Sequence, residues 1–246
     1  MPRNYIIHPI PLMKVEFPKP KMTYLMNFGE TIPIVIYVWF LEGGERTIIV
    51  DAGITPERLI KRGYKVEPIQ SLADGLSRVG LTVGDVDLII ATHLHHDHFY
   101  LAHEFPRAEV IVQEAEIQFA RNPHPMIAQM WPADYRELLV GLQFRVVEGD
   151  TRVDDGVELL LTPGHSAGTQ SVAINTNQGT AIIAGFCCIR ENFDPPPAIK
   201  DRMPLIAPGI NLNALQAYES VERVKKLADM IVPIHEADLI DKATIP

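Results

Sequence analysis

The sequence predicts one domain of the mixed α/β or α+β class. Short aliphatic and β-branched runs alternate with helical patterns along all 246 residues. Each strand-rich half is followed by helices, which favours layers in the order helix, sheet, sheet, helix. No repeat or interdomain linker interrupts this pattern, and the length fits one large domain. We therefore expect residues 1–246 to form a single domain.

The predicted strands are short apolar runs bounded by Gly, Pro, Asp or Asn, as strands usually are. In chain order they are Ile34–Leu41, Arg46–Val50, Leu88–Ala91, Glu109–Val112, Phe144–Val147, Val157–Leu161, Ser171–Asn175, Ala181–Ala184 and Met230–Ile234. Residues 42–45, which read Glu-Gly-Gly-Glu, predict a hairpin turn between the first two strands.

Helical spacing and capping residues predict the helices. In chain order they are Pro56–Arg62, Ser71–Val79, Glu114–Ala120, Pro132–Leu142 and Leu212–Leu227. Thr82 and Asp85 form a capping-box pattern for a further turn, and Asn211 or Asn213 is expected to cap the last helix. The apolar stripe of that last helix is interpreted as core packing.

Composition excludes several partners. The net charge of -9, from 22 basic and 31 acidic residues, argues against nucleic acid or an anionic membrane as the main partner. The two cysteines are adjacent and cannot make a disulfide framework, which favours a reducing compartment. No secretory h-region is visible, and the longest apolar stretch, Ile32–Leu41, is far short of the ~20 residues of a membrane span. We expect a cytoplasmic protein.

Histidine is the unusual residue, with nine in the chain. A buried strand runs into His93, His95, His96, Asp97 and His98. On an extended chain His93 and His95 point to the same side, as a metal ion requires, and a helical turn would aim Asp97 and His98 at a second ion. The alternative is a solvated His-rich loop, but a strand seldom precedes such a tract. His96 points away and is expected in solvent or supporting the ligands.

Two more histidines follow apolar strands. His165 comes after a strand and a Pro-Gly turn, and His235 ends the last predicted strand. A lone histidine at such a place is usually structural, but strand ends of one sheet converge on one edge, so three such sites favour a shared metal centre. His8, His103 and His124 lack this context and are expected at the surface.

The run from His93 to His98 resembles the HxHxDH signature of the metallo-β-lactamase superfamily. Thr162-Pro-Gly-His165-Ser, the late His235 and the Asp-x-Gly at Asp51 resemble its further motifs. Segments such as Gly156–Ser166 and Arg190–Phe193 are similar to the N-acyl homoserine lactonase branch. The resemblance implies an αβ/βα sandwich and one or two Zn²⁺ ions, with iron and manganese as alternatives.

The resemblance also implies a role for each matching residue. It places one ion on His93, His95 and His165, and the other on Asp97, His98 and His235. Asp51 would orient a ligand histidine. Asp97 is the expected catalytic residue, relaying a proton while zinc-bound hydroxide attacks a carbonyl carbon.

One position departs from the family. The usual bridging aspartate is replaced, because the strand over Ala181–Ala184 continues Gly185-Phe186-Cys187-Cys188. A tyrosine of the lactonase branch is also replaced, by Cys188 or Ile189. Three explanations stay open: Cys187 or Cys188 ligates as thiolate, only one ion binds tightly, or the chain is a binding-incompetent relative. Small-residue core packing is the alternative role of the cysteine pair.

The expected reaction is hydrolysis of a cyclic ester or amide, on a small-molecule substrate other than an acyl homoserine lactone. A homodimer is a further expectation. The loops around residues 18–31 and 125–131 and the segment after Phe193 would form the pocket. The expected pocket side chains are Phe28, Phe99, Tyr100, Trp131 and Phe186.

Three other functions are open at this point. A thioester hydrolase of the glyoxalase II type would need a cationic surface, for which Lys200 and Arg202 are candidates. An iron-dependent oxidoreductase is the second, since the same fold hosts iron sites. The third is a metal-binding or sensor protein without catalytic activity.

Overall fold

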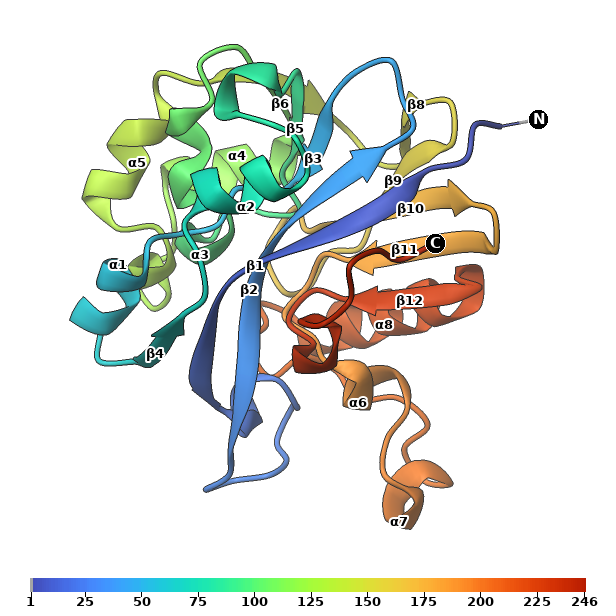
Figure 1. Cartoon of the computed structure of the whole chain (residues 1–246). Helices are drawn as coiled ribbons and strands as arrows, with labels where there is room; N and C mark the ends of the chain where they lie inside the picture. Colours follow the sequence, from blue (N-terminus) through green and yellow to red (C-terminus); the bar gives the residue numbers. More distant parts are fainter. Residues whose placement is uncertain (1) are drawn as a thin grey trace.

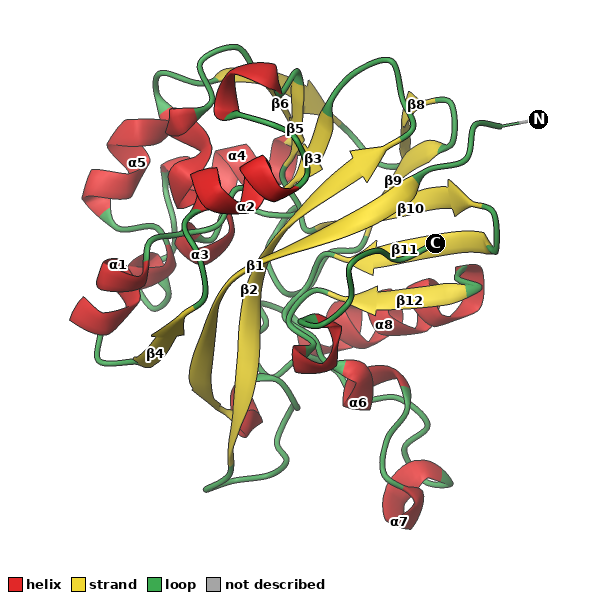
Figure 2. Ribbon diagram, in the orientation of Figure 1, coloured by secondary structure: helices red, strands yellow, loops and turns green. Residues whose placement is uncertain are grey.

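Two β-sheets lie face to face between two outer layers of helices (Figures 1 and 2). The computed structural model describes residues 2–246. The first sheet has the strand order β4-β1-β2-β3-β5-β6-β7 and the second β12-β11-β10-β9-β8. The first comprises β1 (Ile6–Pro18), β2 (Thr31–Glu42), β3 (Ile48–Val50), β4 (Lys65–Pro68), β5 (Leu88–Ile90), β6 (Glu109–Gln113) and β7 (Gln143–Val147). The second comprises β8 (Thr151–Asp154), β9 (Val157–Leu161), β10 (Gln170–Thr176), β11 (Gly179–Ala184) and β12 (Met230–Pro233).

Five helices accompany the first sheet and three the second. They are α1 (Pro56–Lys61), α2 (Leu72–Arg78), α3 (His96–Phe99), α4 (Glu114–Arg121), α5 (Ala133–Leu139), α6 (Arg190–Phe193), α7 (Pro197–Lys200) and α8 (Ala214–Leu227). Among residues 2–246, no helix combines the length and apolar character that a membrane span needs.

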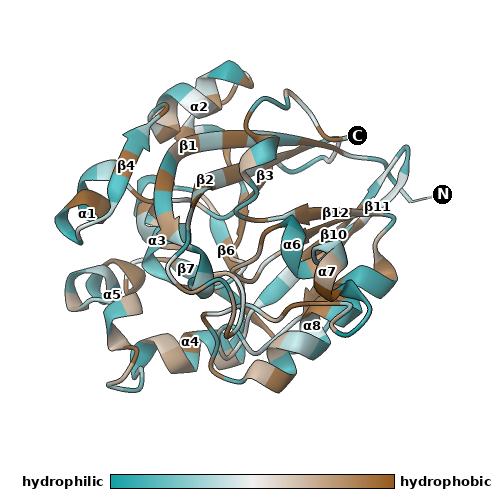
Figure 3. Ribbon diagram, turned by 90° about the horizontal axis from the view of Figure 1, so that it is seen from below, coloured by the Kyte–Doolittle hydropathy of each residue, from teal (hydrophilic) through white to brown (hydrophobic). Residues whose placement is uncertain are grey.

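Strand β2 shows how the sequence produces the layers. Successive side chains of a strand point to opposite faces, and both faces of β2 are apolar. Val35 and Trp39 pack into the core between the sheets, whereas Ile34 and Val38 pack into the core beneath α1, α2, α4 and α5. A third core lies between the second sheet and α8. The interior strands are accordingly mostly hydrophobic, whereas α4 and α8 carry both kinds of residue (Figure 3). This confirms the predicted four-layer sandwich.

All nine predicted strands and all five predicted helices are present, with ends shifted by a few residues. Three strands were missed: β1, β4 and β8. The prolines of β1 concealed it, because proline cannot donate to a sheet ladder. The sheet tolerates Pro9 and Pro11, since β4 pairs only with residues 13–16 of β1, and a register shift separates Pro11 from Met13.

The topology gathers the ends of several strands at one place. β5 lies parallel to both β3 and β6, so the chain leaves β3 and β5 at the same edge. Asp51 directly follows β3, and His93 comes three residues after β5. In the second sheet, His165 follows β9 and His235 follows β12. Residues far apart in sequence thereby meet where the two sheets adjoin.

Candidate metal centre

Six side chains form two adjacent groups with the geometry of metal ligands. One group is His93, His95 and His165, and the other is Asp97, His98 and His235. Within each group the three potential ligand atoms lie within 4.8 Å of one another. All five histidines are at least 97% buried, so the groups are enclosed by the protein. These are the groupings that the resemblance implied.

The segment after β5 and helix α3 orient the ligands that come from the first sheet. His93 and His95 lie in the extended segment after β5, two residues apart. Helix α3 then begins at His96 and turns Asp97 and His98 toward the second group. The predicted helical turn is confirmed. The N–H groups of Ala52 and Gly53 both donate to the carbonyl of His98, at 2.8 Å, and so attach this turn to the end of β3.

Hydrogen bonds to the other ring nitrogen fix the tautomers of three histidines. His165 Nδ1 donates to the carbonyl of Ile210 at 2.7 Å, and His235 Nδ1 donates to that of Val35 at 3.1 Å. His98 Nδ1 lies 2.9 Å from Asp51 Oδ2 and donates to it. Each neutral ring therefore presents an unprotonated Nε2 to the centre.

These nitrogen atoms need a cation between them. His98 Nε2 and His235 Nε2 are 3.2 Å apart, and His165 Nε2 and His93 Nε2 are also 3.2 Å apart. Two lone pairs at this distance repel unless a positive charge lies close to both. Asp97 Oδ1 is buried without a hydrogen-bond partner among residues 2–246. A donor set of imidazoles and one carboxylate fits Zn²⁺, in one or two sites.

The electrostatics keep most of the ligands in their metal-binding forms. Burial, followed by the neighbouring imidazoles, lowers the pKa of His93 and His95 well below the usual value. Burial lowers the pKa of His165 to about 4 and that of His235 to about 3. Burial alone would raise the pKa of Asp97, but the imidazoles, His98 first, outweigh it and hold the pKa below its usual value. Neutral imidazole and ionised carboxylate are the forms that bind metal.

His98 differs from the other histidines. Burial favours its neutral form, but Asp97 and Asp51 outweigh that effect and raise its pKa. Asp51 is completely buried, and it also accepts hydrogen bonds from the backbone N–H and the hydroxyl of Thr92. It therefore ties His98 to the segment that carries His93.

Sequence reasoning missed Glu116, which connects two ligand-bearing loops. Its side chain is completely buried in the first turn of α4. Oε1 accepts the N–H of Leu94 at 2.9 Å, while Oε2 accepts the Ser166 hydroxyl at 2.6 Å and the Gly168 N–H at 2.9 Å. The sequence did offer a sign of this role, because Glu116 lies near the start of a helix that directly follows a buried strand. The loop of His93 and His95 is thus joined to that of His165.

A cavity of about 580 Å³ opens onto both ligand groups. His95, Asp97, His98, His165 and His235 lie in its wall. Apolar side chains surround them, and these are Val15, Phe17, Ile34, Ile36, Leu59, Ile127, Met130 and Ile210. Its remaining side chains include Lys21, Arg62 and Tyr64. A small molecule with apolar parts can therefore reach the centre.

The five aromatic residues expected in the pocket do not line this cavity. Phe28 is 73% exposed, and Phe99 and Phe186 lie in hydrophobic cores. The Tyr100 hydroxyl accepts a hydrogen bond from Arg58 at 3.0 Å. The ring of Trp131 packs edge-on against that of His95, 4.6 Å between centroids, and so supports a ligand.

The prediction took its aromatic residues from the expected pocket loops, from the segment after His98 and from the position after Gly185. β1 and β2 contribute Val15, Phe17, Ile34 and Ile36 to the cavity walls, and β1 was missed. The loops predicted around residues 18–31 and 125–131 contribute Lys21, Ile127, Gln129 and Met130. For His96 the solvent alternative is corrected, because the side chain is buried and lines the cavity beside the ligands. Of the histidines expected at the surface, His103 and His124 are exposed, whereas His8 is half-buried and pairs with Glu42 at 2.7 Å.

Neither cysteine joins the two ligand groups. Cys188 Sγ lies in the core beside α8, 3.7 Å from the carbonyl of Ala184. Cys187 lines the cavity, but its Sγ lies 3.3 Å from Met22 Sδ. Burial raises the pKa of both thiols, which disfavours the thiolates that bind metal. Cys188 therefore has the alternative role given above, packing in a hydrophobic core.

No carboxylate can reach the centre from the end of β11 in this arrangement. Phe186 packs against Phe193, with ring centroids 6.0 Å apart, in the core beside α8. A Cβ atom on Gly185 would lie 1.9 Å from the carbonyl oxygen of Gln170. Gln170 therefore fills the space that a side chain at position 185 would need.

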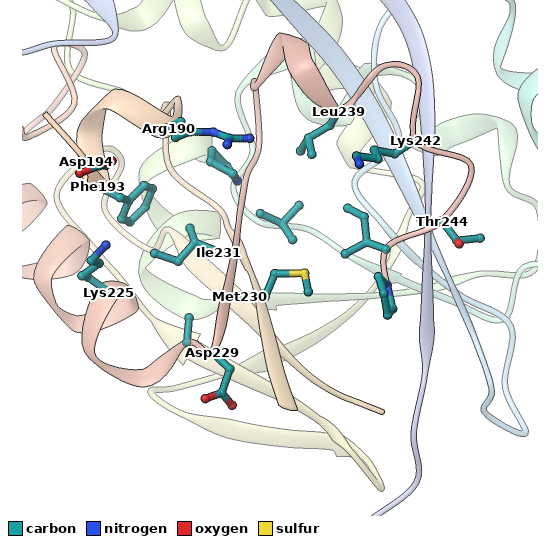
Figure 4. A pocket seen from close by; sticks show the side chains of 15 residues that line it. Arg190, Phe193, Asp194, Lys225, Asp229, Met230, Ile231, Leu239, Lys242 and Thr244 are labelled. Atoms are coloured by element: carbon teal, nitrogen blue, oxygen red, sulfur yellow. The ribbon is translucent and has the colours of Figure 1, made fainter. Parts of the chain in front are cut away.

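A second cavity, of about 620 Å³, lies between β12 and the C-terminal segment (Figure 4). Met230, Ile231 and Leu239 are among its apolar lining residues, and Arg190 and Lys242 among its charged ones. None of the six ligand side chains lines it. It is therefore separate from the metal centre.

Two facing sheets with a buried histidine-rich centre where they adjoin indicate a metal-dependent protein of the class to which metallo-hydrolases belong. Residues 31–186 match the model of the metallo-beta-lactamase superfamily, and the chain belongs to this superfamily. N-acyl homoserine lactonase AiiA from Bacillus thuringiensis subsp. kurstaki is 28% identical over 220 residues, 84% of this chain and 81% of that protein.

Solved structures show the same relationship. A quorum-quenching N-acyl homoserine lactone lactonase matches with a TM-score of 0.77 and 26% identity, over 98% of this chain and 95% of that one. An N-acyl homoserine lactone hydrolase with N-hexanoyl-L-homoserine bound at the catalytic metal center matches with a TM-score of 0.75 and 25% identity, over 97% and 95%. The chain is thus a lactonase-like hydrolase, which disfavours the thioester hydrolase and oxidoreductase alternatives. Lys200, a candidate for the former, pairs with Asp194 and does not line the cavity.

Proposed function

We propose that this protein opens the ring of a lactone by metal-assisted hydrolysis. The observation that carries the proposal is the pair of ligand groups at the wall of a cavity with largely apolar surroundings. Similarity to N-acyl homoserine lactonases supports the choice of a cyclic ester.

We assign one Zn²⁺ site to His93, His95 and His165, and a second to Asp97, His98 and His235. Zinc supplies a Lewis acid for the carbonyl oxygen and acidifies water at neutral pH. Asp51 and Glu116 position the ligands through the hydrogen bonds described above. Without a bridging carboxylate, the two sites are expected to differ in affinity.

Asp97 is the residue proposed to move protons. Its carboxylate has two oxygens, so one can bind the metal while the other accepts a proton from the attacking water. It then passes this proton to the ring oxygen as the C–O bond of the lactone breaks. The apolar wall limits the access of other water molecules to the reacting carbonyl.

The substrate is proposed to differ from an acyl homoserine lactone. The lactonase branch places a tyrosine near the substrate carbonyl, whereas Cys188 or Ile189 occupies that part of this sequence. Both residues are buried, and neither lines the cavity. Carbonyl binding must therefore use other groups.

Hydrolysis assays test the function. The zinc-loaded protein is incubated with lactones of different ring size and substituent, together with lactams and thioesters, and product acids are measured. We expect turnover of at least one lactone and its loss in His165→Ala. Lack of turnover of every lactone by protein with full metal occupancy would contradict the proposal and favour the sensor alternative.

Three further expectations belong to this proposal. Residues 1–246 act as one domain, the protein works in the cytoplasm, and it forms a homodimer. Both cysteines are free and buried, in keeping with a reducing compartment. Fractionation of cells and sedimentation of the purified protein test location and oligomeric state.

A further inference from the structure

Two cationic side chains face the metal-centre cavity without a carboxylate partner. Lys21 and Arg62 both line the cavity. Neighbouring cations outside its lining are paired: Lys19 with Glu30 and Glu191, Arg58 with Asp134, and Lys65 with Glu16. Among residues 2–246, neither Lys21 nor Arg62 forms an ion pair. The only acidic side chain in the lining is Asp97, which we assign to a metal.

Lys21 is held in position by aromatic groups. Its ammonium nitrogen lies 5.1 Å from the centroid of Phe17 and 5.3 Å from that of Tyr64, and it donates to the Tyr64 hydroxyl at 3.2 Å. The two rings stack at 5.7 Å. Its backbone carbonyl accepts the N–H of Ile210 at 2.9 Å. These contacts orient the ammonium group without neutralising its charge.

Arg62 is anchored by a backbone carbonyl of the cavity lining. It lies directly after α1, and its Nη1 donates to the carbonyl of Gln129 at 2.9 Å. A guanidinium has five N–H donors, so most of them stay available. Gln129 also lines the cavity, which keeps this contact at the same surface.

The surroundings make the cavity attractive to an anion. Five of the six proposed ligands are imidazoles, which bind a metal ion as uncharged ligands, and the carboxylate that would bridge two ions is missing. Bound Zn²⁺ would therefore leave a larger positive charge than in a site with that carboxylate. Lys21 and Arg62 add to the same field, and a cleft with charges of one sign concentrates oppositely charged ligands.

We propose that Lys21 and Arg62 bind an anionic substituent of the lactone, a carboxylate or a phosphate group. This inference rests on the proposed lactonase function and specifies its substrate class. Apolar side chains such as Phe17, Leu59 and Met130 share the lining and would contact the hydrocarbon part of the same molecule. The substrate class is thus an amphipathic lactone with a negative charge on its substituent.

Three matched lactones test this proposal. Each has the same ring and an alkyl substituent of the same length, ending in a carboxylate, a phosphonate or a neutral carboxamide. We expect the zinc-loaded enzyme to show about tenfold or higher kcat/KM for one or both anionic lactones over the carboxamide, since hydrogen bonds to charged groups have this magnitude. The lactone with the higher kcat/KM shows whether the natural substituent carries a carboxylate or a phosphate group. Added salt should reduce the preference.

Variants and a binding measurement separate recognition from catalysis. Lys21→Met and Arg62→Gln should each remove most of the preference while the carboxamide lactone is still hydrolysed. Lys65→Gln, next to Tyr64 but paired outside the cavity lining, is the matched control and should retain it. Lactams with the same three substituents are expected to bind in the same order of affinity, measured by calorimetry with zinc-loaded and metal-free protein.

The outcomes distinguish the two proposals. Equal kcat/KM for the three lactones, with equal lactam affinities, would overturn anion recognition but leave the lactonase function intact. An equal loss for all three lactones in Lys21→Met would also overturn it and assign Lys21 a structural role. If no lactone is hydrolysed, the proposed function fails, and the lactam affinities alone decide anion recognition.

Discussion

Asp51 has an unusual backbone conformation and a buried carboxylate shared by two partners. Its φ angle is 59°, in the left-handed region that non-glycine residues seldom adopt. The conformation directs its carboxylate to His98 Nδ1 and to Thr92. Such backbone strain persists where the surrounding contacts fix it, and here those contacts belong to the metal centre.

Replacing Asp51 by asparagine should weaken metal binding. The amide is similar in size but has no negative charge and only one oxygen acceptor. Loss of such a partner commonly reduces metal affinity by about 10–100-fold. Competition with a chromophoric chelator measures this affinity. Asp87→Asn is the control, because Asp87 accepts the N–H of Thr47 and does not contact a ligand; an equal loss in both variants would contradict the role of Asp51.

His165→Ala should abolish metal binding at its group and hydrolysis with it. His165 is the only ligand of that group from the second sheet, and its ring is fixed by the carbonyl of Ile210. Elemental analysis gives the metal stoichiometry, and the lactone assay gives the activity. His103→Ala, in an exposed position, should change neither. Full activity in His165→Ala would refute the proposed site.

Cysteine substitutions should leave the number of bound ions unchanged. Cys188 Sγ lies in the core and Cys187 Sγ contacts Met22 Sδ, so neither is directed at the ligand groups. We therefore expect the metal stoichiometry of Cys187→Ser and Cys188→Ser to equal that of the parent protein, measured by elemental analysis after dialysis. A fall in either variant would restore thiolate ligation.

Local sequence was sufficient to predict the ligands and two of the loops that line the cavity, but not the rest of its wall. The ligands from His93 to His98 lie in one short segment, and His165 and His235 each come shortly after an apolar strand. The ends of apolar strands therefore predicted all of these ligands. Lys21 lies in the predicted 18–31 loop, but its contact with Tyr64 depends on the pairing of β1 with β4. That pairing is long-range, and prolines concealed β1. The rest of the pocket wall therefore required the three-dimensional structure.

The start of α8 packs against the turn that presents His165. Asn213 caps this helix, accepting the N–H groups of Leu215 at 3.1 Å and Gln216 at 3.2 Å. Sequence left Asn211 and Asn213 as alternatives, since both precede the apolar stripe. The backbone of Gly164 lies against Ala217, where an added Cβ would be 2.3 Å from the Ala217 nitrogen. Helix and turn are thus closely packed.

Gly164→Ala should reduce both stability and zinc affinity. Gly164 has a φ of +115°, so alanine is strained there and also collides with backbone that cannot easily move. Strain of this kind alone costs about 1–3 kcal/mol. Gly63→Ala is the matched control, with a φ of +86° but open space around its Cβ position. Urea unfolding measures the stability, and chelator competition measures the zinc affinity. Equal losses in Gly164→Ala and Gly63→Ala would show that backbone strain alone causes them.

The metal centre joins the two sheets of the sandwich. His93 and His95 extend from the first sheet and His165 from the second, while His98 follows the first and His235 the second. Each ligand group therefore contains side chains from both halves of the chain. The apolar core between the sheets supplies the general attraction, and the ligand groups fix how the two edges meet.

Removing the metal should therefore destabilise the entire sandwich. An ion that binds only the folded protein stabilises it by about 4 kcal/mol when its free concentration is a thousandfold above Kd. For a protein of this size, each kcal/mol shifts Tm by roughly 2–4 °C, so chelation should lower Tm by about 8–16 °C per tightly bound ion. Differential scanning calorimetry before and after chelation, with zinc restored as control, measures the shift. Cooperative unfolding of both halves at the lower temperature is expected, because the ligands connect the sheets. An unchanged Tm after verified metal removal would show that the apolar core alone holds the two sheet edges together.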